Sequence, residues 1–210
     1  MRTNEILEQC LESLALQDYP KERFEIILVS KNPLLRKEEG GIRAIHGIEF
    51  AHARNEGVKA SRGELIAFVD DDCVMPKDWL SKAARYFETK DVGVIGGPAL
   101  PLENDTFRHR VGGYLLCSVF SSGFASARYK VPPKVREAQE YSLIAANNVL
   151  RREVFEGVGG FDPKQALSEE NDLYFRMKQK GYKLLFVPDV FVWHRAKPIW
   201  RPLVQKVFFY

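Results

Sequence analysis

An apolar run that leads directly into three carboxylates constrains the fold of this chain more than any other feature of its sequence. Residues 65–69 have the length and composition of a strand, Asp70, Asp71 and Asp72 follow at once, and Pro76 ends the run. Desolvating a carboxylate costs several kcal/mol, and neighbouring like charges raise that cost. The cluster therefore needs a cation or open solvent at the carboxyl end of the strand.

Two interpretations of these acids are open at this point. Hard oxygen ligands suit Mg²⁺ or Mn²⁺, which bind one or two protein carboxylates and leave their other positions to substrate phosphates and water. In the alternative, the acids form a solvated turn that caps a helix beginning near Pro76. The motif alone does not decide between them.

The remainder of the chain alternates between helical and strand-like patterns. Helices are predicted over residues 3–14, 51–61, 79–88 and 151–158 and from Ser168 onward, and strands over residues 24–29, 42–50, 92–98, 183–187 and 190–194. Such alternation favours an α/β fold with a mostly parallel sheet and helices on both of its faces. With 210 residues, the chain is expected to form one domain, residues 1–210.

Composition excludes several classes of partner. A formal net charge of +3 suits an anionic ligand but is too small for a nucleic-acid-binding surface, so no nucleic acid is expected as a partner. Three cysteines without metal-binding spacing indicate a reducing compartment. No stretch of about 18 uninterrupted apolar residues is present, so no membrane span is predicted. We therefore expect a cytoplasmic protein, either free or at the inner face of the membrane.

The middle of the chain, residues 100–141, has the least regular pattern. An apolar segment with small residues, 111–120, is followed by a basic, proline-containing run, 128–136. One interpretation is a surface helix with a solvated loop. The other is a flap on the acceptor side or a face that rests on a membrane, since apolar and basic groups adjoin there.

A second acid cluster lies in the C-terminal part. Glu169, Glu170 and Asp172 open an amphipathic helix that Ser168 is placed to cap, and acids in a first helical turn complement the helix dipole as well as they suit catalysis. Further on, an apolar run ends at His194. A histidine there is either structural or a metal ligand.

Taken together, these motifs resemble those of the inverting family 2 glycosyltransferases, over nearly the whole chain. The resemblance rests on Ala53-Arg54-Asn55 with Gly57, on residues 63–72, on Gly159-Gly160-Phe161-Asp162, on residues 169–176 with Gly181-Tyr182, and on His194. Each motif is weak alone, but their order and spacing are similar to those of the family.

The resemblance implies a GT-A-type fold, a nucleotide-diphosphate sugar as donor, Mg²⁺ or Mn²⁺ as cofactor, and a glycan or lipid-linked acceptor. It implies a donor-binding half of about residues 1–100 and an acceptor-side half of about residues 101–210. By the same resemblance, Asp70 and Asp72 are the outer carboxylates of a DxD-like metal motif, with Asp72 the more direct ligand and His194 an added one. Asp70 and Asp71 also bind the donor, together with Arg54.

The second cluster corresponds to the family's catalytic base. An inverting transfer needs one carboxylate that takes the proton from the attacking acceptor hydroxyl. The family usually shows Glu-Asp at this point, whereas this chain has Glu169-Glu170, so Glu170 occupies the position of the base. Glu169 and Asp172 are expected to orient the acceptor or to cap the helix.

The chain departs from the family in two places. It begins at the first helix, without a preceding strand of the Val-Ser-Val-Ile-Ile-Pro type, and its second strand is followed by Ser30-Lys31-Asn32 instead of an acidic pair. The sequence therefore leaves open a catalytically impaired or truncated binding module, and less strongly a nucleotidyltransferase, although the glycine-rich phosphate loop of the latter class is absent from the sequence. We also expect that an added upstream strand of about ten residues would raise stability and donor affinity, because unpaired strand edges are costly. The apolar end, residues 207–210, suggests further chain or a membrane contact.

Overall fold

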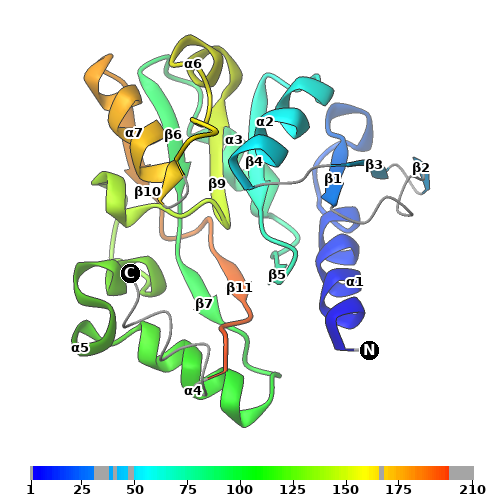
Figure 1. Ribbon diagram of the computed structural model, residues 1–210, viewed down its shortest axis with the longest axis vertical. Helices are drawn as coiled ribbons and strands as arrows, with labels where there is room; N and C mark the ends of the chain where they lie inside the picture. The colour runs from blue at the N-terminus through cyan, green and yellow to red at the C-terminus, as the bar shows by residue number, and fades with distance from the viewer. Residues whose placement is uncertain (1, 31–37, 40–41, 47–49, 166–167, 199–210) are drawn as a thin grey trace.

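The computed structural model of the protein describes residues 2–30, 38–39, 42–46, 50–165 and 168–198 (Figure 1). Lys31 and Asn32, which stand where the family shows an acidic pair, and the apolar residues 207–210 lie outside these ranges. None of the helices in these ranges combines the length and the apolar composition that a membrane span needs.

The central sheet has five strands in the order β4-β9-β6-β10-β8. They are β4 (Leu65–Val69), β9 (Asn147–Arg151), β6 (Val92–Gly96), β10 (Lys183–Phe186) and β8 (Arg136–Glu137). Strand β9 is antiparallel to both β4 and β6, with Val149 opposite Ala67 and Ile95, while β10 is parallel to β6. Strands β4, β6 and β10 therefore share one direction, and their carboxyl ends lie at one edge of the sheet.

Two smaller sheets flank the central one. The first has the order β1-β3-β2 and contains β1 (Ile26–Ser30), β3 (Ile42–His46) and β2 (Glu38–Glu39). The second has the order β5-β11-β7 and contains β5 (Cys73–Val74), β11 (Val192–His194) and β7 (Ala99–Pro101). The second sheet forms below the carboxyl ends of β4 and β6 (Figure 1).

The mixed α/β class is confirmed, and the described pairings are more mixed than the alternating pattern predicted. Three of them are parallel and five are antiparallel. The physical reason is the middle of the chain, which makes a long excursion through α4, α5 and a 3-10 turn beyond the carboxyl edge of the sheet (Figure 1). Because this excursion ends beside the carboxyl edge, β9 enters the sheet in the reverse direction, antiparallel to β4 and β6.

The helices lie close to the predicted ranges. They are α1 (Arg2–Ala15), α2 (Phe50–Ala60), α3 (Trp79–Arg85), α4 (Phe107–Leu116), α5 (Val119–Ser122), α6 (Arg152–Gly157) and α7 (Glu169–Gln179), with 3-10 turns η1 (Lys21–Arg23), η2 (Gly123–Tyr129) and η3 (Glu140–Ser142). Helix α3 ends sooner than predicted, and the apolar segment 111–120 is divided between α4 and α5.

The core has two parts, one on each face of the central sheet. Val94 and Ile95 are adjacent in β6 and both fully buried, yet they belong to different apolar clusters, because successive side chains of a strand point to opposite faces. One cluster contains Trp79 of α3, and the other contains Leu173 of α7. The sheet is therefore covered on both faces, as predicted.

Strands β1 and β4 are not paired with each other in the described part of the chain. A cavity of about 550 Å³ lies between them, lined by both strands and by apolar side chains of α1 such as Leu7 and Leu11. The expectation that an additional strand would raise stability and donor affinity concerns this part of the fold, and it stays a prediction.

Candidate functional site

The acid cluster lies where β4 ends and the chain turns into β5. The carbonyl of Asp70 accepts a hydrogen bond from the amide of Cys73 at 3.2 Å, which closes the turn. Strand β5 then pairs antiparallel with β11, and this register places His194 directly opposite Cys73. The second small sheet thus brings a histidine from the end of the chain to the first acid cluster.

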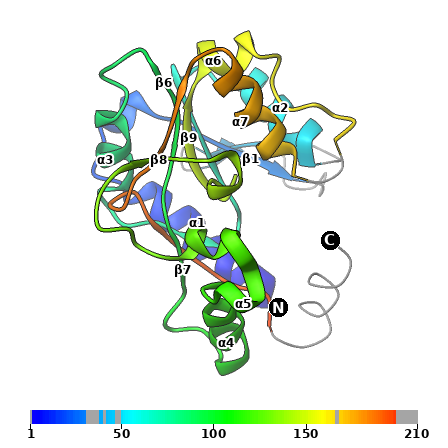
Figure 2. The same cartoon turned by 90° about the vertical axis from the view of Figure 1, so that its left-hand side faces the viewer.

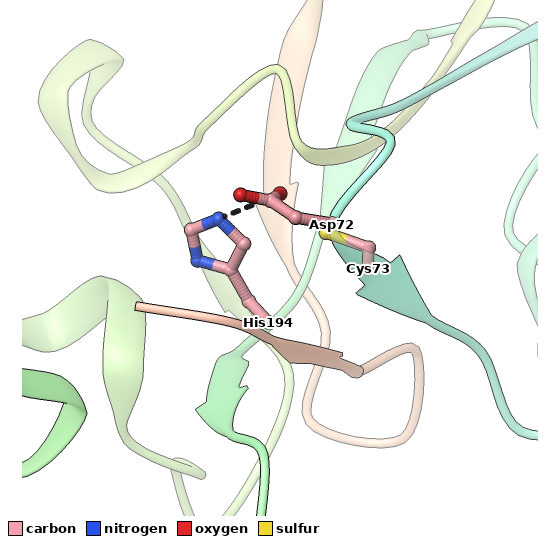
Figure 3. Close-up of side chains that lie close together, drawn as sticks. All are labelled: Asp72, Cys73 and His194. Carbon is pink, nitrogen blue, oxygen red and sulfur yellow. Dashed lines mark ion pairs between the residues drawn. The ribbon is translucent and has the colours of Figure 1, made fainter. Parts of the chain in front are cut away.

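Asp72 and His194 form the closest pair at this turn (Figure 3). His194 Nε2 lies 3.2 Å from Asp72 Oδ1, and the two side chains are 20% and 34% exposed. The main chain fixes the arrangement further, because the amide of Arg195 donates to the carbonyl of Asp72 at 3.0 Å. The structure therefore brings together two of the three residues that the sequence singled out as metal ligands, while the third, Asp70, lies 3.4 Å from Arg54.

This pair fits a hard divalent cation. Adjacent ligands of an octahedral ion with bonds of about 2.1 Å lie about 3 Å apart, close to the observed separation. Asp72 Oδ1 is buried and receives no hydrogen bond with good geometry, so it has acceptor capacity to spare. Ligand atoms of Asp72, Cys73 and His194 all lie within 4.8 Å of one another.

Cys73, although near this pair, does not suit such an ion. Its side chain is fully buried, and its thiol donates to the carbonyl of Ala146 at 3.6 Å. Burial, and after it the charges of Asp72 and Asp70, raise the pKa of this thiol well above its usual value. A neutral, soft sulfur is a poor ligand for Mg²⁺ or Mn²⁺, so Asp72 and His194 are the residues that fit the ion.

Asp71, the middle acid of the cluster, has different surroundings from Asp72. The residue is exposed and lines the cavity between β1 and β4 together with Asp70. Partial burial raises the pKa of Asp71, and the charges of Asp72 and Asp70 raise it further. The three carboxylates therefore repel one another, and a bound cation would relieve that repulsion.

Arg54 connects the two acid clusters. It extends from α2, and its Nη1 lies 2.5 Å from Glu169 Oε1 on α7 while its Nη2 lies 3.4 Å from Asp70 Oδ1. The guanidinium also lies over the ring of Phe161, with its central carbon 5.6 Å from the ring centroid. The first acids of both clusters, 99 positions apart in the chain, thereby contact one cation.

The neighbouring Asn55 holds the turn that carries Phe161. Its side-chain amide donates to the carbonyl of Phe161 at 2.8 Å, and its Oδ1 accepts from the amide of Phe161 at 3.1 Å. Gly160 has φ +70, and a Cβ there would lie 3.0 Å from Asn55 Oδ1. Both the conformation and the close approach require glycine, so two of the sequence motifs form one structural unit.

Asp172 helps to hold the turn that carries Phe161, because it binds an arginine that contacts this turn. Its Oδ2 accepts from Arg176 Nε and Nη2 at 2.9 and 2.7 Å, and Arg176 in turn donates to the carbonyls of Val158 and Gly160. In this arrangement Asp172 orients a structural arginine. Ser168 occupies the N-cap position of α7 with φ 54, but its side chain makes no capping hydrogen bond.

Glu169 and Glu170, adjacent in sequence, have different environments. Glu169 is held by Arg54 and its side chain is only 12% exposed. Glu170 is partly buried and makes no hydrogen bond or ion pair with the described residues. Its charge lies near Tyr129 and Tyr174, whose pKa values are raised mainly by burial and further by Glu170. Glu170 is thus the acid of the second cluster that is not paired with an arginine of the described residues, unlike Glu169 and Asp172.

Two asparagines beside the site were missed as positioning residues in the sequence analysis. Asn147 is fully buried at the start of β9, opposite Val69; its Oδ1 accepts from Trp79 Nε1 at 3.0 Å, and its amide donates to the carbonyls of Pro98 and Val190. Asn148 donates to the carbonyl of Ile144 at 3.1 Å and contacts the hydroxyl of Tyr174. Consecutive asparagines just before an apolar run were the only signal in the sequence.

Comparison with solved structures identifies the type of fold. The TarS fragment 1–349 from S. aureus in complex with UDP-GlcNAc has a TM-score of 0.67 at 15% identity, and the match covers 97% of this chain and 58% of TarS. The mannosyltransferase PcManGT from Pyrobaculum calidifontis, in complex with GDP-Man and Mn²⁺, has a TM-score of 0.64 at 18% identity, with 97% and 58% covered. The fold is of the GT-A glycosyltransferase type.

Sequence comparison gives the family. A family model described as Glycosyl transferase family 2 matches residues 2–159, and the chain belongs to this family. The glycosyltransferase AglE of Haloferax volcanii is 26% identical over 97% of this chain and 67% of its own length. The O-antigen biosynthesis protein RfbC of Myxococcus xanthus is 27% identical over 86% of this chain but only 16% of its own length. The chain thus spans only part of its relatives.

Proposed function

We propose that this chain transfers a sugar from a nucleotide-diphosphate donor to an acceptor hydroxyl, with inversion at the anomeric carbon and with Mg²⁺ or Mn²⁺ as cofactor. The observation that carries this proposal is the Asp72–His194 pair at the carboxyl end of β4, which Arg54 and Asp70 connect to the acids of α7. Family membership and neighbours with nucleotide sugars support it.

In this proposal Asp72 and His194 hold the cation, and Asp70 completes the DxD-like motif. When bound, the cation neutralises the donor diphosphate and stabilises it as a leaving group. Arg54 keeps Asp70 in position and adds positive charge beside the diphosphate, and Asp71 contributes to the donor side from the cavity between β1 and β4. Residues of about 1–100 thus bind the donor, and residues of about 101–210 bind the acceptor.

Glu170 acts as the base. It takes the proton from the acceptor hydroxyl as the oxygen forms its bond to the anomeric carbon and the bond to the nucleotide diphosphate breaks on the opposite face. Glu169 is already paired with Arg54, and Asp172 with Arg176, so neither is as available for the proton. These two acids orient the acceptor or stabilise the first turn of the helix.

The cavity between β1 and β4 favours one second candidate. The cavity lies in the proposed donor-binding half, next to Asp70 and Asp71. The alternative to a transferase is therefore a module that binds a nucleotide sugar without turnover. We place either activity in the cytoplasm. The described cysteines are free, which suits a reducing compartment.

Donor binding and transfer are measured separately to test these assignments. Titration calorimetry with UDP- and GDP-sugars is run in Mn²⁺, in Mg²⁺ and in EDTA, and the anomeric configuration of any product is read by NMR. Asp72→Asn is expected to abolish cation-dependent donor binding, because it removes an anionic oxygen from an ion with few protein ligands. Undiminished donor affinity of Asp72→Asn in Mn²⁺ would overturn the metal assignment.

Glu170→Gln is expected to leave donor affinity unchanged and to lower the transfer rate by roughly 10²–10⁴-fold, since the amide keeps the shape but cannot accept a proton. Glu169→Gln is the matched control, because it makes the same chemical change one position earlier. If Glu169→Gln loses the rate and Glu170→Gln keeps it, the base is Glu169. Donor binding without transfer for the unsubstituted chain would favour the binding module.

A further inference from the structure

The exposed large apolar side chains of the protein are gathered in one segment. In the described part of the chain, all but two of them lie between Phe107 and Tyr141, and the two exceptions are Leu16 and Phe175. The set comprises Phe107, Tyr114, Val119, Phe120, Phe124, Val131, Val135 and Tyr141. Scattered apolar residues on a surface need no explanation, but such a concentration marks an interaction surface.

The same segment carries a one-sided charge. Between Thr106 and Arg136 the sequence contains no aspartate or glutamate, while it contains six basic residues: Arg108, Arg110, Arg128, Lys130, Lys134 and Arg136. Because the whole chain has a formal net charge of only +3, the remainder of the chain is net acidic. The excess of positive charge of the protein is therefore located among its exposed apolar residues.

Helix α4 presents one outward face in this segment. Phe107, Arg110 and Tyr114 follow the three- and seven-residue spacing of a single helical face, and all three are exposed. The opposite face is fixed against the protein at two glycines: a Cβ on Gly112 would lie 2.2 Å from the carbonyl of Lys197, and one on Gly113 would lie 2.7 Å from Pro101. The orientation of α4 is thus set by close packing.

Helix α5 and the 3-10 turn η2 continue this surface. Phe120 is 105% exposed and Phe124 is 84% exposed, and the Phe124 ring lies 6.3 Å from that of Tyr141. Figure 2 turns this side toward the viewer and shows α4 and α5 on the same side of the molecule, below the central sheet. We call α4, α5, η2 and the loop to residue 136 the apolar–basic surface.

The apolar–basic surface adjoins the second acid cluster. Arg128 Nη2 lies 3.4 Å from Asn171 Oδ1 on α7, and the charge of Glu170 raises the pKa of Tyr129, next in sequence, beyond the larger effect of burial. An acceptor held at this surface would therefore present its hydroxyl group near the proposed base.

We infer that the apolar–basic surface binds the interface of an anionic membrane and that the acceptor is lipid-linked. Aromatic and aliphatic side chains insert among the headgroups, and lysine and arginine side chains beside them pair with anionic lipids. A purely electrostatic partner would not need fully exposed phenylalanines, and a purely apolar one would not need six cations without a single acid. The nature of the acceptor rests on the proposed function, whereas membrane binding does not.

Co-sedimentation of the chain with vesicles of defined composition tests the surface without any transfer reaction. Vesicles of phosphatidylcholine alone are compared with vesicles that contain phosphatidylglycerol, at low and at high salt. Phe120→Ser with Phe124→Ser is expected to weaken binding about tenfold or more, from the lost burial of two phenyl rings. Lys130→Gln and Lys134→Gln are each expected to weaken binding to the anionic vesicles about fivefold.

Leu16→Ser and Lys90→Gln serve as matched controls, because both side chains are exposed and lie outside the apolar–basic surface. They are expected to bind vesicles as the unsubstituted chain does. The inference fails if the chain does not bind anionic vesicles, or if the controls reduce binding as much as the test variants. It also fails if Phe120→Ser abolishes concentration-dependent self-association in light scattering while leaving vesicle binding intact, since a second copy would then occupy the surface. A chain that binds vesicles but transfers no sugar would refute the proposed function alone.

Discussion

Replacement of Arg54 by glutamine tests the connection between the two acid clusters. The substitution removes the cation that lies 2.5 Å from Glu169 and 3.4 Å from Asp70, and it leaves both carboxylates in place. The arginine and Glu169 side chains are only 18% and 12% exposed, so water restores little of the lost solvation. We expect a loss of both stability and donor affinity.

The size of the loss follows from this burial. Removing one partner of a fully buried ion pair costs about 3–5 kcal/mol, whereas an exposed pair contributes less than about 1 kcal/mol. The Arg54–Glu169 pair lies between these limits and nearer the buried one, which gives about 2–3 kcal/mol in the free energy of unfolding. For a domain of this size, such a loss lowers the Tm by about 4–12 °C.

Urea denaturation at 25 °C measures the free energy of unfolding, and a double-mutant cycle with Glu169→Gln isolates the pair. Lys59→Gln is the matched control on the same helix: Lys59 also pairs with a glutamate, at 2.7 Å, but its side chain is 73% exposed. The control should show no measurable change. If Arg54→Gln behaves like Lys59→Gln, or if the cycle gives no coupling, the two clusters are not joined as described here.

Three further predictions concern a buried asparagine, a glycine with positive φ and the middle acid of the first cluster. Asn147→Ala should cost about 2–3 kcal/mol in urea denaturation, because the buried Trp79 Nε1 loses its acceptor, and unchanged stability would contradict this role. Gly160→Ala should cost about 1 kcal/mol or more, since φ is +70, and Gly157→Ala, whose Cβ meets no atom within 4 Å, should cost less. The pKa of the Asp71 carboxyl is raised in the native chain. At pH values between the ordinary pKa and the raised pKa, the native chain therefore binds more protons than the unfolded chain. The free energy of unfolding in EDTA should therefore fall as pH rises through this window, and Asp71→Asn should remove the fall. Equal pH dependence of stability in the unsubstituted chain and in Asp71→Asn would refute this prediction.

Features set by local sequence were the predictable ones. The strand that ends in the acid cluster is apolar until Val69 and charged from Asp70, so both its position and its end were visible in the sequence. The approach of His194 to Asp72 needed only the assumption that its apolar run enters a neighbouring strand. In each case the apolar run ends at the residue where a polar side chain begins, so the end of the strand was visible locally in the sequence.

Features set by distant pairing were not predictable. Arg54 and Glu169 are 115 residues apart, and nothing near either residue indicates the other. The reversed direction of β9 depends on where the long middle excursion ends, and the bonds of Asn147 join three separate segments. Strand patterning reports which residues are buried, but it does not report strand direction.

Glu169 and Glu170 are adjacent acids, and the position of Glu170 on α7 distinguishes it from the other acids of the helix. Helix α7 buries Leu173, Tyr174 and Met177, while Phe175 is 53% exposed. These buried residues lie three, four and seven positions after Glu170, so Glu170 belongs to the centre of the face that points into the protein, and Asp172 lies on the opposite face. A carboxylate on the core-facing stripe of a helix carries a desolvation cost that a surface acid avoids. In the proposed reaction, Glu170 accepts the proton of the acceptor hydroxyl from this position.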